Sequence, residues 1–172
     1  PPGRYLGTTA GPGGRAWDHT GAAGAEFRRA IDGNYLDRAG RGTFQGVTND
    51  HWVEIDLGEA APRTGPLYLL ASGWTHPTDS SINVAIGQGR GPKPEGLVLE
   101  VPAADGGWTV ARPGLGFPSG QNKTIVVVLN GIFPPEALTR RCRLRTNLEI
   151  FWDSIAVAGA APGPAISTQR LS

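Results

Sequence analysis

Oxygen-bearing side chains gather in one short stretch of the sequence, where Asp32, Asn34 and Asp37 fall within six residues. Gly33 lies between the first two and permits a tight bend. Carboxylate and amide oxygens around such a bend suit a hard cation such as calcium. The same side chains can instead cap the backbone of an Asx-type turn. Both interpretations stay open, and calcium is the one cofactor that these residues suggest.

Two other segments carry residues that could bind a ligand. Trp74 and His76 are surrounded by Gly, Thr, Pro and Asp, which is the composition of a rigid loop. An aromatic ring exposed on such a loop can stack on the apolar face of a sugar. Arg145 and Asn147 could then hydrogen-bond the sugar hydroxyls. The alternatives are core packing for Trp74, and turn geometry or cross-strand ion pairing for the other two.

Nucleophilic catalysis has weaker support in the sequence. His19, His51 and His76 each lie near an aspartate, and two serines follow the last of them. No Gly-x-Ser-x-Gly turn and no His-x-x-x-His pair accompanies these residues. The single cysteine, Cys142, alternates inward on a predicted strand, where a thiolate is poorly stabilised. We therefore expect a protein that is not an enzyme.

Composition and charge limit the class of protein. The chain has 16 basic and 15 acidic residues, so we expect no binding to nucleic acid. No apolar run is long enough for a membrane span, and a lone cysteine cannot form an internal disulfide. All but two of the basic residues are arginines, which is typical of a GC-rich bacterial genome. Because the sequence contains no Met, we expect a processed protein or part of a larger one.

The elements that would position these residues are short strands. The 26 glycines and 15 prolines are scattered between brief apolar runs, a pattern typical of strands joined by turns. In residues 51–58, Val53, Ile55 and Leu57 alternate with polar positions and Trp52, which predicts a half-buried strand. The same criteria predict strands at residues 66–72, 81–87, 97–101, 108–112, 124–131, 141–146 and 148–157.

Three of these strands allow finer predictions. An Ala-Asp-Gly-Gly turn after residues 97–101 predicts a hairpin with the strand that follows. Residues 124–131 are apolar on both faces, which favours the middle of a sheet. A bend between the last two strands would set an arginine of the first opposite Glu149 or Phe151. Trp152 falls on the same face of its predicted strand as Leu148 and Ile150, so we assign it to the core.

Together these patterns predict an all-β protein, an antiparallel β-sandwich of jelly-roll type. We expect the sandwich to span residues 18–157. Residues 1–17 form a Gly/Pro-rich segment before it, and residues 158–172 have the composition of a linker or tail.

The beginning and end of this range resemble a known fold. AIDGNYLDRAGRGTFQGVTNDHWVEIDLG (30–58) is similar to the opening of galactose-binding-like sandwiches, the discoidin or coagulation-factor C-type modules. In those modules an Asp-Gly loop is followed by a Trp-containing strand that ends in an Asp-Leu-Gly turn. RLRTNLEIFWDSIAV (143–157) resembles the closing strands of related carbohydrate-binding modules. The resemblance implies calcium in the Asp-Gly loop with a carboxylate from the closing strand, and Asp153 is the matching residue.

The middle of the sequence, residues 73–88 and 115–131, departs from the discoidin pattern. It resembles a module of exported bacterial proteins that carry FG-GAP propeller or tetratricopeptide repeats. This implies an extracellular or cell-surface location, with neighbouring protein domains or subunits as partners. The leading hypothesis is therefore a non-catalytic structural or interaction module. A carbohydrate-binding module with structural calcium is the alternative, and a hydrolase on the same scaffold ranks third.

Overall fold

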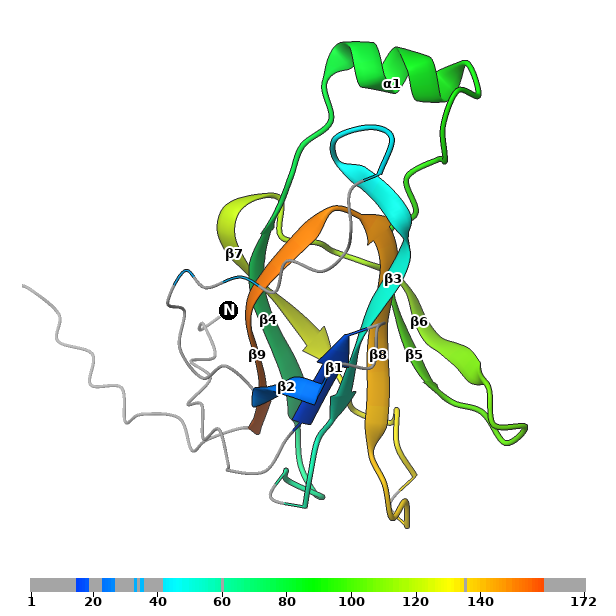
Figure 1. Ribbon diagram of the computed structural model, residues 1–172. Helices are drawn as coiled ribbons and strands as arrows, with labels where there is room; N and C mark the ends of the chain where they lie inside the picture. The colour runs from blue at the N-terminus through cyan, green and yellow to red at the C-terminus, as the bar shows by residue number, and fades with distance from the viewer. Residues whose placement is uncertain are drawn as a thin grey trace, which may run out of the picture.

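Two antiparallel sheets pack face to face in this protein (Figure 1). The computed structural model describes residues 15–18, 23–26, 33, 35, 42–59, 61–134 and 136–159. One sheet contains β1 (Arg15–Asp18), β2 (Ala23–Glu26), β3 (Val47–Asp56), β5 (Leu97–Pro102), β6 (Trp108–Leu115) and β8 (Arg141–Leu148). The other contains β4 (Leu67–Thr75), β7 (Gly120–Val128) and β9 (Ile150–Gly159). The predicted all-β antiparallel sandwich is confirmed.

The order of the strands defines the two layers. The six-stranded sheet runs β2-β1-β3-β8-β5-β6, and the three-stranded sheet runs β7-β4-β9. Every named strand pair is antiparallel, and the hairpin predicted after residues 97–101 is the β5–β6 pair. The described strands begin at Arg15 and end at Gly159, against a predicted sandwich range of 18–157. In the described part of the chain, no helix has the length and apolar character needed to cross a membrane.

The core lies between the inner faces of the two sheets. Val53 and Ile55 of β3 are buried as their alternation predicts, and they lie opposite Leu144 and Cys142 of β8. Trp152 of β9 is also buried, in agreement with its assignment to the core. Burying each large aliphatic side chain of this kind contributes roughly 1.5–3 kcal/mol. The other members include Leu69, Ala71, Leu97, Leu99, Val127 and Ile155.

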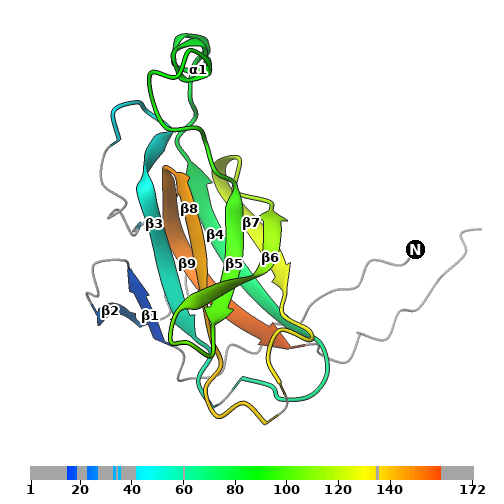
Figure 2. The same cartoon turned by 90° about the vertical axis from the view of Figure 1, so that its right-hand side faces the viewer.

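The strand predicted at residues 81–87 is wrong, because this segment forms the helix α1 (Ser80–Gly87). Asp79 has an extended backbone and its Oδ1 accepts the N–H of Ile82 at 2.8 Å, so it caps the helix N-terminus. Ile86 is the one buried residue of α1, and Val84 faces solvent. The alternation of apolar and polar residues in this segment therefore does not indicate a strand. The helix projects beyond the end of the sandwich (Figure 2), so its apolar residues do not pack in the core between the sheets.

The sequence of residues 124–131 predicts a strand in the middle of a sheet, and this prediction is wrong. Residues 124–128 form the second half of β7, which among the described strands is an edge strand next to β4. Val127 and Leu129 point into the core, whereas Val126 and Val128 are 51% and 44% exposed. An apolar residue on each face of a strand thus does not require cover on each face.

The predicted hairpin of the last two strands is also wrong. β8 pairs with β3 and β5, whereas β9 pairs with β4 in the other sheet. Glu149 is the one residue between them, and the chain crosses there from one sheet to the other. Because both strands turn one face to the same core, a crossover and a hairpin have the same alternation. The arginine at 143 lies opposite Glu54 and Glu100 instead.

Charged and aromatic side chains interlock on the outer face of the six-stranded sheet. The guanidinium of Arg143 lies 4.6 Å from the ring centroids of both Trp52 and Trp108. It also donates to Glu100, which is 5% exposed and accepts a second bond, of 3.0 Å, from Nε of Arg145. Arg141, Arg143 and Arg145 on this face therefore have carboxylate or aromatic partners within the chain.

Candidate ligand-binding pocket

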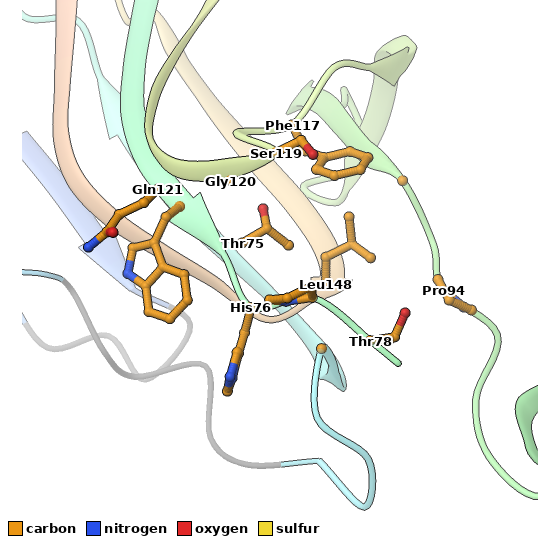
Figure 3. Close-up of a pocket in the computed structure, with 13 residues that line it drawn as sticks. Thr75, His76, Thr78, Pro94, Phe117, Ser119, Gly120, Gln121 and Leu148 are labelled. Carbon is orange, nitrogen blue, oxygen red and sulfur yellow. The ribbon is translucent and has the colours of Figure 1, made fainter. Parts of the chain in front are cut away.

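A pocket of about 810 Å³ opens at the end of the sandwich where the chain passes from β4 to α1. Figure 3 shows Thr75 and Leu148 between Gln121 on one side and Phe117 and Pro94 on the other. The lining comes from the ends of strands and from the loops that join them. Its volume falls within the range of ligand-binding clefts, roughly 300–1,000 Å³.

Uncharged groups dominate the lining of this pocket. Trp74, Phe117, Pro77, Pro94 and Leu148 supply apolar surface, and further positions are glycines, threonines, a serine and a glutamine. Among the described lining residues there is no aspartate, glutamate, lysine or arginine. The pocket therefore suits an apolar or polar but uncharged group, because the described lining offers no carboxylate, lysine or arginine to pair with a buried charge.

Glu149 joins two walls of the pocket. Its Oε2 accepts the backbone N–H of Gly46 at 2.8 Å and contacts Nδ1 of His76 at 3.2 Å. Its backbone N–H donates to Gly46 O at 3.1 Å, and the N–H of His76 donates to Glu149 O at 3.0 Å. The crossover residue thus fixes both the loop before β3 and the segment after β4.

Gly46 makes the contact between these walls close. Its φ of +86° lies in the left-handed region that favours glycine. A Cβ added there would lie 2.8 Å from Thr78 Cγ2 and 2.9 Å from the carbonyl oxygen of His76. Gln45 adds a bond of 2.8 Å from Nε2 to the carbonyl of Pro77. The two walls are therefore in direct backbone contact.

Trp74 and His76, both predicted to bind ligand, line the pocket together. Trp74 is not on a loop but near the end of β4, where its ring stacks on Phe151 at 4.7 Å and 13°. Tyr35 meets it edge-on at 6.3 Å and donates its hydroxyl to Asn122 Oδ1 at 2.6 Å. One face of the indole is therefore occupied by the protein, which limits its use as a stacking surface.

Phe117 is the exposed aromatic ring of the pocket, and sequence reasoning missed it. It is 42% exposed, yet the loop that bears it is firmly anchored. Thr75 Oγ1 donates to the carbonyl of the buried Pro118 at 2.8 Å, and Thr75 forms a parallel bridge with Ser119. The available signal was a Phe-Pro pair between glycines at 116 and 120, outside any alternating pattern.

Asn147 and Arg145, the other two predicted ligand-binding residues, belong to β8 rather than to a closing loop. Asn147 is buried, accepts the N–H of Glu95 at 2.6 Å and donates to the carbonyl of Lys93 at 2.8 Å. It thereby holds the segment that presents Pro94 to the pocket. Arg145 points to the outer face, where its hydrogen bond to Asp50 (2.9 Å) is the main cause of its raised pKa.

The predicted calcium ligands lie only partly within the described residues. Asp32, Asn34 and Asp37 fall outside them. Asp153 is buried in β9 and its Oδ1 accepts the N–H of Gly33 at 3.2 Å, so the closing strand does meet this segment. No group of three His, Cys, Asp or Glu residues that could hold a metal occurs in the described part of the chain. Calcium stays a prediction.

Cys142 and two of the histidines that the sequence offered for nucleophilic chemistry lie away from the pocket or outside the described residues. Cys142 is a free thiol in the core, and burial, with Glu54 and Asp56 nearby, raises its pKa to about 12. His51 is buried in contact with Thr48, and His19 lies outside the described residues.

We expect Cys142 to resist alkylation in the folded protein. A pKa of about 12 in place of 9.0 lowers the thiolate fraction at neutral pH about 1,000-fold. Iodoacetamide labelling followed by mass spectrometry should give unmodified native protein and full labelling in urea. Rapid labelling of the native protein, with unchanged circular dichroism, would contradict the burial of this thiol.

Comparison with protein-family models, with curated proteins and with solved structures found no match to this chain.

Proposed function

We propose that this protein is a non-catalytic interaction module whose pocket takes an uncharged, apolar segment of a neighbouring domain or subunit. The observation that carries the proposal is the pocket of about 810 Å³, in which no described lining residue is acidic or is a lysine or arginine. A charged ligand group would lose its hydration there without a compensating partner. An apolar segment instead gains free energy as its surface leaves water.

The kind of segment follows from the shape and composition of the lining. Trp74 and Phe117 lie in the same pocket as Pro77 and Pro94. Aromatic rings on fixed supports bind extended, proline-containing or aliphatic peptides well, because these lose little conformational freedom on binding. The walls joined by Glu149 and Gly46 are already in place, which reduces the cost of ordering the site.

The proposal includes no catalytic step. Nδ1 of His76, the one titratable side chain of the described lining, is held by Glu149, and Cys142 stays protonated in the core. The resemblance of the middle of the sequence to modules of exported bacterial proteins suggests an extracellular or cell-surface setting, and we propose the same setting for this chain.

We expect Phe117→Ser to weaken peptide binding at least about tenfold while leaving the thermal midpoint nearly unchanged. The probe is a peptide enriched from a phage-displayed random library on the immobilised protein, and we expect it to be uncharged and rich in proline or aliphatic residues. Val110→Ser is the matched control, because Val110 is 48% exposed against 42% for Phe117 and lies outside the pocket.

Isothermal titration with the enriched peptide compares the three proteins. Equal affinity for the Phe117 variant and the wild-type protein would contradict the proposed site. Enrichment of strongly charged peptides would contradict the proposed partner chemistry.

A carbohydrate-binding module is the second candidate, and the exposed ring of Phe117 favours it. Gln121, Thr78 and Ser119 line the same pocket and could hydrogen-bond hydroxyl groups around a sugar stacked on that ring. Native gels that contain xylan, laminarin or galactan test this alternative. Retardation that Phe117→Ser abolishes, with no peptide enriched from the library, would replace the peptide by a glycan as ligand.

A further inference from the structure

The open edge of β7 has the composition of a strand that pairs with another chain. β7 pairs with β4 from Val128 to Lys123, and no second strand lies beside it in the described part of the protein. Residues 124–128 read Thr-Ile-Val-Val-Val, without charge or proline, and Val126 and Val128 are 51% and 44% exposed. Uncharged edge strands of this kind readily join a neighbouring β-strand.

The orientation of the backbone shows which groups are open. The carbonyl of Val128 points away from β4, because it accepts a hydrogen bond from Arg112. Backbone groups alternate along a strand, so those of Val126 and Thr124 point to the same open edge. A second strand could hydrogen-bond these groups in register.

Arg112 covers one end of this edge. Its Nε donates to Val128 O and its Nη2 to Asn130 O, both at 3.1 Å. The side chain reaches from β6, the edge strand of the six-stranded sheet, to the edge strand of the other sheet. One carbonyl that an added strand would need, that of Val128 at the end of β7, is therefore taken, and the guanidinium places a charge beside it.

A bulge in β6 directs Arg112 to this place. Leu99 lies opposite Arg112 and the next residue, Glu100, lies opposite Val110, so Ala111 is an extra residue in β6. Such an insertion twists a strand locally and re-aims the side chains beside it. The contact of Arg112 with β7 thus follows from the register of the sheet.

We propose that the β7 edge is a latent interface for a second copy of this chain, and that Arg112 keeps it closed. Two β7 strands in antiparallel register would bring uncharged residues 124–128 against themselves, so no charge would lack a partner. The three-stranded sheets would then continue into one another across a two-fold axis. This proposal is independent of the ligand of the pocket, because β7 beyond residue 121 does not line it.

The test removes the guanidinium and measures association. Arg112→Ala should give a dimer whose fraction rises with protein concentration in sedimentation velocity, whereas the wild-type protein should remain a monomer. Arg90→Ala, the loss of an exposed arginine on the loop after α1, is the matched control and should remain monomeric. Adding Val126→Lys to Arg112→Ala should restore the monomer, because it places a charge in the paired strand.

Hydrogen exchange keeps the test decisive if association is weak or the fold is perturbed. The amide protons of Thr124 and Val126 should exchange quickly in the wild-type protein and slowly in concentrated Arg112→Ala. An Arg112→Ala protein that is folded and monomeric at every concentration would overturn the proposal. So would a dimer that Val126→Lys leaves intact, or a wild-type dimer in which these amides are already protected.

Discussion

Replacing Glu100 by alanine should lower the free energy of unfolding by about 3–5 kcal/mol. The carboxylate is 5% exposed and accepts hydrogen bonds from both Arg143 and Arg145. Arg143 lies between the rings of Trp52 and Trp108, so its guanidinium would stay partly buried without its carboxylate partner. Urea denaturation followed by circular dichroism measures the loss.

Glu95→Ala is the control for this prediction. Glu95 also faces Arg145, but at 3.7 Å and with a side chain that is 62% exposed. An exposed pair of this kind contributes about 0–1 kcal/mol, so its loss should shift the midpoint little. If the two variants unfold at the same urea concentration, the outer face of the six-stranded sheet is not the stabilising layer that its contacts indicate.

The second large effect is expected for Gly46→Ala, at the junction of the pocket walls. The new Cβ would lie 2.8 Å from Thr78 Cγ2 and 2.9 Å from both His76 O and Thr78 N, at a φ of +86°. We expect a loss of about 2–4 kcal/mol, from backbone strain together with displacement of the segment after β4. Peptide binding should fall with it, because that segment carries His76 and Thr78.

Gly65→Ala separates the two causes. Gly65 has a similar φ of +81°, but no atom lies within 4 Å of an added Cβ. Its substitution should therefore show the strain of the left-handed backbone alone, about 1–2 kcal/mol, with unchanged peptide binding. Equal losses for the two variants would mean that the walls are not packed as closely as Gly46 requires.

The positions of most predicted strands agree with the structure, except at residues 81–87, which form α1, but the places of the strands in the sheets could not be predicted. The alternation of Val53, Ile55 and Leu57 identifies which face of β3 is buried. It carries no information about which strand lies beside β3, because pairing depends on the path of the chain. The same limit explains the errors at β7, an edge strand, and at Glu149, a crossover between sheets.

The candidate site shows a similar division. Trp74 and His76 could be selected from the sequence, because an aromatic and a histidine stand among loop-forming residues. Phe117, Gly46 and Glu149 could not, since their roles depend on contacts between segments that are far apart in the chain. Only the fold brings the loop before β3 to the residue between β8 and β9.

Titration of the isotopically labelled protein with the enriched peptide, followed by ¹⁵N–¹H correlation spectra, tests the central proposal most directly. Each indole N–H gives a separate signal, so Trp74 reports on the pocket and Trp108 on the outer face of the six-stranded sheet. The proposal predicts shifts at Trp74, at the side-chain amide of Gln121 and at the amide of Gly46, with Trp108 unchanged. Shifts confined to Trp108 and its neighbours, or no shift at any pocket residue, would contradict it.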